Sequence, residues 1–156
     1  NDLVKADEYT KMALSKNSSH SQAKELAAYI SAKQTEGMLE EAVKLYEGEE
    51  YDKAVALFDK ILKISPNDAN VYYYRALSQD ALKNYQKAIS DYQAAVKISP
   101  EMNISYYSIA VDYDNLENYK SAKEYYKKYV DLIEEDNTYK EYAQTRLKEL
   151  SQWVLQ

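Results

Sequence analysis

The side chains that could do chemistry in this chain are few, and their spacing favours recognition over catalysis. His20 is the only histidine and there is no cysteine, which excludes a histidine pair, a thiolate nucleophile and a cysteine metal site. Gly37 and Gly48 are isolated, whereas a phosphate-binding loop needs clustered glycines. Adjacent acids such as Glu49 and Glu50 point in different directions on a helix and make poor joint ligands. We therefore expect no catalytic residue, no metal site and no cofactor, and a protein that is not an enzyme.

The charge of the chain narrows the class of its partners. The formal net charge is −6, the wrong sign for generic binding to a phosphate backbone, so nucleic acid is not expected as a partner. No apolar run approaches the ~18 residues that a membrane span needs, and no signal-peptide pattern opens the chain. The chain begins with Asn1 rather than Met, which favours a fragment or a processed form of a longer protein.

The composition predicts that helices position the side chains that remain. Two Gly and two Pro in 156 residues are very few for a β-rich chain, which needs turn residues every few positions. Ala, Leu, Lys, Glu and Gln dominate the segments between them, as helix propensity favours. We therefore expect an all-α fold.

Both prolines stand in the same four-residue word, KISP, at residues 63–66 and 97–100. Sliding residues 51–84 onto residues 85–118 needs no gap and leaves 13 of the 34 positions identical. A third copy follows in phase, although Glu134 stands where its proline would be. An internal repeat of this length indicates stacked supersecondary units.

Each copy divides into two helices. Asn84 and Asn118 stand directly before the second helix, where an N-cap side chain is expected, and Pro66 and Pro100 follow its end. The first helix, at residues 70–82, carries apolar residues on two sides. Two apolar sides predict two neighbours, as in a solenoid.

The spacing of small, aromatic and proline residues resembles the tetratricopeptide repeat. Residues 69–102 carry the residue types of that signature at Tyr72, Ala76, Tyr85, Ala88, Tyr92, Ala95 and Pro100. The resemblance implies a right-handed α-α superhelix of antiparallel helix pairs that ends in a capping helix. The expected units are a degenerate helix pair at 1–34, repeats at 35–68, 69–102 and 103–136, and the capping helix at 137–156.

In resembling proteins the first helix of each repeat lines a concave groove that binds peptides. Carried onto this chain, the groove is aromatic and aliphatic along its middle, with carboxylates at one side. Its expected residues are Leu39, Val43, Tyr46, Asn70, Tyr73, Leu77, Asp80, Ile104, Tyr107, Val111, Asp114 and Asn115.

The resemblance also disfavours one ligand class, the chaperone C-terminal tails that some family members bind through a carboxylate clamp. Some family members hold a peptide carboxylate with a Lys and an Asn on the first helix, and the equivalent residues in the middle repeat are Tyr73 and Leu77. We therefore expect a scaffold for a protein or peptide with apolar anchors and basic flanks, because aromatic pockets supply anchors and Asp80 and Asp114 could meet cations.

Three alternatives stay open at this point. The groove could be filled from within, by the C-terminal helix or by a segment outside this chain. The last helix, rich in tyrosine and ending near Trp153, could instead be a surface for self-association into a homo-oligomer. Finally, the chain could be a helper domain of a larger protein whose active domain lies elsewhere.

Overall fold

The computed structural model describes residues 2–17 and 19–153, without the side chains of Asp2, Leu3 and Trp153. Trp153, on which the self-association alternative relies, therefore has a side chain outside the described part. The described residues form eight helices and no strand, which confirms the all-α prediction. The helices are α1 (Asp2–Lys16), α2 (Ser21–Glu47), α3 (Tyr51–Ile64), α4 (Ala69–Ala81), α5 (Tyr85–Ile98), α6 (Ile104–Asn115), α7 (Tyr119–Leu132) and α8 (Thr138–Trp153).

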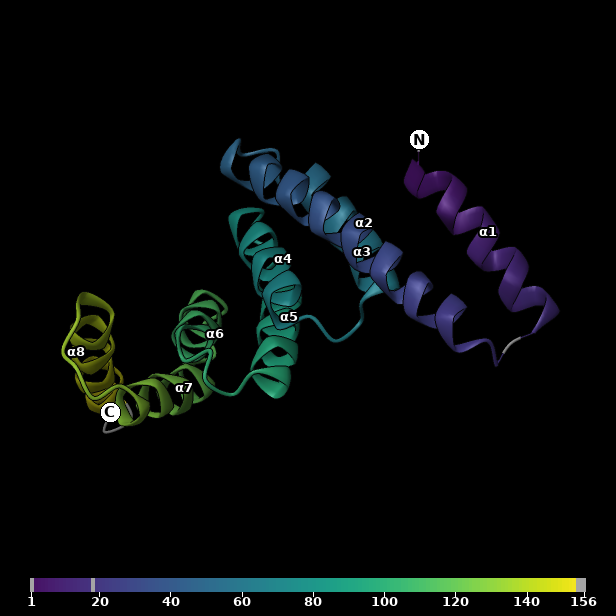
Figure 1. Ribbon diagram of the computed structural model, residues 1–156. Helices are drawn as coiled ribbons and strands as arrows, with labels where there is room; N and C mark the ends of the chain where they lie inside the picture. Colours follow the sequence, from purple (N-terminus) through teal and green to yellow (C-terminus); the bar gives the residue numbers. More distant parts are fainter. Residues whose placement is uncertain (1, 18, 154–156) are drawn as a thin grey trace.

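The helices form a curved array in which each packs mainly against its neighbours in sequence (Figure 1). The pairs α2–α3, α4–α5 and α6–α7 stack one after another, and α8 closes the C-terminal end. Such a solenoid has no central core, because each unit buries its apolar surface against the next.

The repeat in the sequence is a repeat of close helix contacts. In each pair one alanine of the first helix and one of the second are 0% exposed. Small residues at these contacts let the helix backbones approach closely. Large side chains at a third equivalent position, also 0% exposed, fill the space beside them. The alanines are Ala42, Ala76, Ala110, Ala54, Ala88 and Ala122, and the large residues are Phe58, Tyr92 and Tyr126.

Helix α2 runs unbroken through the boundary that the repeat pattern predicts between residues 34 and 35. The N-terminal pair is therefore α1 with the first half of α2, and it shares that helix with the first repeat. No proline stands in this segment, and a single glycine costs a helix only about 1 kcal/mol. Gly37 lies at the surface with no atom within 4 Å of an added Cβ, so no packing demands a turn there.

The turn inside each pair uses a residue in the left-handed region three times. Glu49, Lys83 and Glu117 have φ of 61°, 60° and 57° and stand at equivalent repeat positions. In the middle turn the Asn84 N–H donates to the Gln79 carbonyl over 2.8 Å, which ends α4 in a Schellman-type motif. A side chain with a Cβ is strained in this conformation, and glycine is not.

We expect Lys83→Gly to raise the free energy of unfolding by roughly 0.5–1 kcal/mol, because it removes this strain. The matched control is Lys60→Gly, exposed in the interior of α3. It should lower stability by about 1 kcal/mol, because glycine weakens a helix interior. Urea unfolding followed by circular dichroism measures both, and equal losses in the two variants would contradict the assignment of strain to residue 83.

Candidate functional site

The twelve residues predicted to line the groove lie on α2, α4 and α6, the first helices of successive pairs. None of the twelve is fully buried: Asn70 and Asn115 are exposed and the other ten are partly buried. The structure therefore leaves each of them some surface for a partner. By helix they are Leu39, Val43 and Tyr46 on α2, Asn70, Tyr73, Leu77 and Asp80 on α4, and Ile104, Tyr107, Val111, Asp114 and Asn115 on α6.

Tyr107 is the centre of an aromatic cluster that joins α6 to α7 and α8. Its ring centroid lies 5.1 Å from that of Tyr139 and 6.0 Å from that of Tyr142, both on α8. On α7, Tyr129 and Tyr126 lie 5.5 and 6.1 Å away. Burial among these rings raises the pKa of Tyr107 to about 12. Helix α8 thus covers part of the predicted groove, while Tyr139 and Tyr142 stay about half exposed and continue its aromatic surface.

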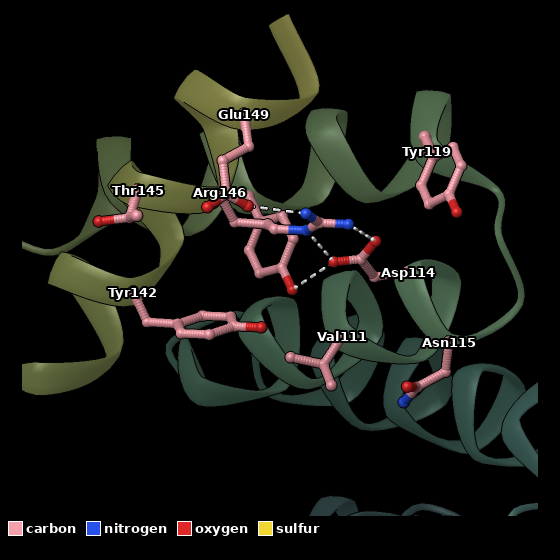
Figure 2. Close-up of a pocket in the computed structure, with 9 residues that line it drawn as sticks. Val111, Asp114, Asn115, Tyr119, Tyr142, Thr145, Arg146 and Glu149 are labelled. Atoms are coloured by element: carbon pink, nitrogen blue, oxygen red, sulfur yellow. Dashed lines mark hydrogen bonds and ion pairs between the residues drawn. The ribbon is translucent and has the colours of Figure 1, made fainter. Parts of the chain in front are cut away.

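A pocket of about 300 Å³ lies between α6, α7 and α8 (Figure 2). Val111, Asp114 and Asn115, all predicted groove residues, line it from α6. From α8 come Tyr142, Thr145, Arg146 and Glu149. The C-terminal helix is therefore a wall of this site as well as an end cap.

Asp114 already has a cation within the chain. Arg146 on α8 donates to both of its oxygens, with Nε–Oδ2 2.6 Å and Nη2–Oδ1 2.8 Å (Figure 2). The Tyr126 hydroxyl donates to the same carboxylate over 3.4 Å, and Glu149 accepts from Arg146 over 2.7 Å. Hydrogen bonding to Asp114, then to Glu149, raises the pKa of Arg146. The expectation that Asp114 would meet a partner's cation is corrected accordingly, because α8 supplies the cation in a bidentate pair.

Asp112 is a functional candidate that the sequence analysis missed. It lies on α6, is 0% exposed, and no N–H or hydroxyl group of a described residue donates to either of its carboxyl oxygens. Its carboxyl faces that of Asp80 on α4. Burial, then the hydrogen bond and charge of Asp80, raise the pKa of Asp112 to about 9. Burial also raises the pKa of Asp80. At neutral pH the two carboxyls therefore hold a shared proton.

A second ion-pair network, partly buried, involves none of the predicted groove residues. Arg75 on α4 donates to both oxygens of Asp91 on α5, at 2.8 and 2.6 Å, and it also pairs with Asp59 on α3. These contacts tie three consecutive helices together.

His20 is the N-cap of α2, where its Nδ1 accepts from the Ala23 N–H over 3.3 Å.

Two further properties bear on the class of site. Across residues 2–17 and 19–153, no group of three or more His, Asp or Glu side chains is arranged to hold a metal ion. In the same residues, no helix combines the length and the apolar character that crossing a membrane requires.

Two family profiles, both described as the tetratricopeptide repeat, match residues 39–103 and 105–136. No curated protein matches the chain. Among solved structures, the repeat domain of Arabidopsis OM64 has a TM-score of 0.70 at 25% identity, covering 76% of this chain and 98% of that domain.

Two more distant structures share the fold. The first repeat domain of Spaghetti (RPAP3), bound to the HSP90 peptide SRMEEVD, has a TM-score of 0.69 at 22% identity, covering 80% of this chain and 95% of that one. The Yersinia enterocolitica type III secretion chaperone SycD, in complex with a peptide of the translocator YopD, has a TM-score of 0.72 at 15% identity, covering 78% and 95%.

Asp112→Asn should remove a pH dependence of stability. Folded Asp112 keeps its proton up to about pH 9, whereas the unfolded chain loses it near the ordinary pKa of 3.8. The folded state binds more protons in this window, so stability falls as pH rises, by at most about 1.4 kcal/mol per pH unit. Relative to the parent chain, the variant should therefore gain stability steadily from pH 5 to pH 8. Urea unfolding at each pH measures this, with Glu124→Gln, an exposed acid, as control; parallel curves for parent and Asp112→Asn would contradict the protonated pair.

Arg146→Leu should lower the free energy of unfolding by about 1–3 kcal/mol, because it leaves the carboxylate of Asp114, only 12% exposed, without its cation. The matched control is Lys127→Leu, which breaks an exposed pair with Asp131 and should change stability by less than about 0.5 kcal/mol. Adding Asp114→Asn to Arg146→Leu should restore part of the loss in a double-mutant cycle. A loss at Arg146 no larger than at Lys127 would show that the pair contributes nothing.

Proposed function

This chain belongs to the tetratricopeptide repeat family, and we propose that it is a non-catalytic scaffold that binds a segment of a partner protein along α2, α4 and α6. The segment carries apolar anchor residues and basic residues beside them. It lies against the twelve predicted groove residues and reaches toward the aromatic surface of α8.

The observation that carries this proposal is that apolar side chains of the predicted groove are partly buried and partly exposed. Tyr73 and Leu77 on α4 and Val111 on α6 pack against the core at one edge and keep part of their surface open. Apolar side chains held in this way are anchors for a partner, because the groove loses little conformational freedom on binding.

The compared structures support a peptide as the class of ligand, and they give less support for the basic character of that peptide. RPAP3 and SycD are each described with a bound peptide, which supports a peptide-binding role for this fold. The RPAP3 peptide, SRMEEVD, is acidic. Here the groove carries Tyr73 and Leu77 where the Lys and Asn of a carboxylate clamp would stand, together with the acidic Asp80. A basic segment is the better electrostatic match.

The alternative of self-association through α8 has less support. The apolar side of α8 faces inward, with Ala143 and Leu150 at 0% and 2% exposure in the cluster that includes Tyr126. Among the α8 side chains that the structure describes, the exposed large hydrophobic ones are Tyr139 and Tyr142, beside the predicted groove. Size-exclusion chromatography with light scattering separates the two functions, because self-association requires a mass that rises with concentration.

We expect Leu77→Lys/Val111→Lys to weaken binding of library-selected peptides at least tenfold, because it places two cations against a basic ligand in a groove that must be apolar. The matched control, Ile64→Lys/Ile98→Lys, makes the same chemical change at exposed positions at the ends of α3 and α5. Fluorescence anisotropy measures affinity, and circular dichroism checks that both variants fold. A folded groove variant that binds as well as the control would overturn the proposed site.

A further inference from the structure

Two junctions of the array bring the same three repeat positions together. At the last junction they are Asp114 on α6, Tyr126 on α7 and Arg146 on α8. At the central junction they are Asp80 on α4, Tyr92 on α5 and Asp112 on α6. Each residue lies 34 positions from its counterpart, so the two sites are copies of one arrangement. The copies differ in charge, because aspartate stands at the central junction where arginine stands at the last.

The last junction shows what this arrangement holds. A carboxylate at the Asp114 position accepts two hydrogen bonds from a guanidinium and one from a tyrosine hydroxyl (Figure 2). Such a bidentate pair fixes both the position and the direction of the cation.

The central junction has the acceptors and lacks the cation. No N–H or hydroxyl group of a described residue donates to either oxygen of the fully buried Asp112, and its carboxyl faces that of Asp80. No described lysine or arginine forms an ion pair with Asp80 or Asp112, and their electrostatic neighbours are each other and tyrosines. A buried pair of carboxyls that no cation stabilises lowers the stability of the folded chain, so a cation from a partner would stabilise this pair.

We propose that Asp80, backed by Asp112, binds the guanidinium or ammonium group of an arginine or lysine side chain of the partner segment. This inference rests on the proposed function and names where the basic residue of that segment is held. Asp80 is partly exposed and is the group that the cation contacts. Asp112 lies behind it and adds negative charge at short range.

Binding at this site is coupled to a proton. Among the described residues, Tyr46 on α2 and Tyr92 on α5 face the pair, and Ser108 on α6 hydrogen-bonds to Tyr92; none of these groups carries positive charge. Burial keeps Asp112 protonated at neutral pH, with a pKa of about 9. A cation beside Asp80 favours the doubly ionised pair, so the carboxyl of Asp112 releases its proton to solvent as the cation enters. Up to one proton is released per cation bound, and affinity rises from pH 6 to pH 8.

An organic cation suits the site better than a metal ion. The site offers two carboxyls and no third acidic or histidine ligand among the described residues, whereas Ca²⁺ takes six to eight oxygens. A divalent cation is nonetheless the competitor that the experiment must separate.

The first experiment is a titration of the chain with N-acetylarginine amide, followed by the ¹³C resonances of the aspartate carboxyls. The matched neutral probe is N-acetylcitrulline amide, and calcium chloride is the third arm. The proposal expects the arginine probe to shift the Asp80 and Asp112 resonances and the other two to leave them unchanged. Shifts with calcium alone, equal shifts with the neutral probe, or no shift with arginine would each overturn it.

Three variants test the mechanism. Asp80→Asn should weaken the arginine probe at least tenfold, while Glu124→Gln should not. Asp112→Arg copies the last junction and should close the site from within, with loss of the probe. Because an arginine at this buried position could prevent folding, Asp112→Asn is the second test: it keeps the shape, and calorimetry in two buffers of different ionisation enthalpy should show that proton release is gone. Unchanged proton release in that variant would refute the coupling.

The same chemistry is then tested on the selected peptides, with each arginine replaced by citrulline and each lysine by acetyl-lysine. A loss of at least tenfold that disappears in Asp80→Asn supports the site. Peptides that bind the groove equally well after replacement leave the scaffold function standing and overturn this inference. A library that yields no groove ligand overturns the scaffold function instead, and the arginine probe still decides the cation site.

Discussion

The close contact of helices at fully buried alanines is the constraint on which the rest of the structure depends. Ala76 of α4 and Ala88 of α5 have no exposed surface, and Ala110 and Ala122 repeat the arrangement one unit later. A larger side chain at any of these positions would force two helices apart, since interiors are packed without spare volume. The spacing of these alanines sets the position of each helix along its axis relative to the next helix. It therefore determines which polar side chains come into contact between adjacent helices.

Because the helices are closely packed, contacts between their polar side chains have a large effect on the stability of the fold. A carboxylate at a junction is removed from water, so it must be paired with a cation or lose its charge. Both outcomes occur in this chain. At the last junction Arg146 neutralises Asp114 through two hydrogen bonds. At the central junction Asp112 has only Asp80 to face, and a retained proton takes the place of the missing cation.

Repeat periodicity was sufficient to predict the helices, the solenoid and the helices that carry the groove residues. It could not predict polar partners, because apolar spacing identifies a buried face and leaves open what a polar group on that face meets. Asn118 caps α7 as expected, through its side-chain oxygen and the Ser121 N–H, whereas the side chain of Asn84 donates to Gln79 and makes no cap hydrogen bond. The predicted unit boundary between residues 34 and 35 lies inside the continuous helix α2, where no proline stands.

The charged contacts at the two junctions could have been found in the sequence, by a comparison of charged positions instead of apolar ones. Placing α8 on α6 at the repeat distance sets Arg146 over Asp112, and placing α6 on α4 sets Asp114 over Asp80. At the last junction this alignment places opposite charges together, Asp114 and Arg146, and at the central junction it places like charges together, Asp80 and Asp112. Only the structure adds that Asp112 is fully buried and that no N–H or hydroxyl group of a described residue donates to its oxygens.

The contrast between the Asp114–Arg146 pair and the Asp80–Asp112 pair relates the stability of the array to the proposed binding of a cation. At the last junction the bidentate pair of Arg146 with Asp114 fixes α8 against α6. The central junction is held from both sides by neighbouring helix pairs, so it can keep an unfavourable acid pair without coming apart. An overall charge of −6 draws basic segments toward the molecule from a distance, and it does not distinguish among them. Under the proposed function, discrimination requires a fixed carboxylate at one point of an apolar groove, and Asp80 is the predicted groove carboxylate that no described lysine or arginine pairs with.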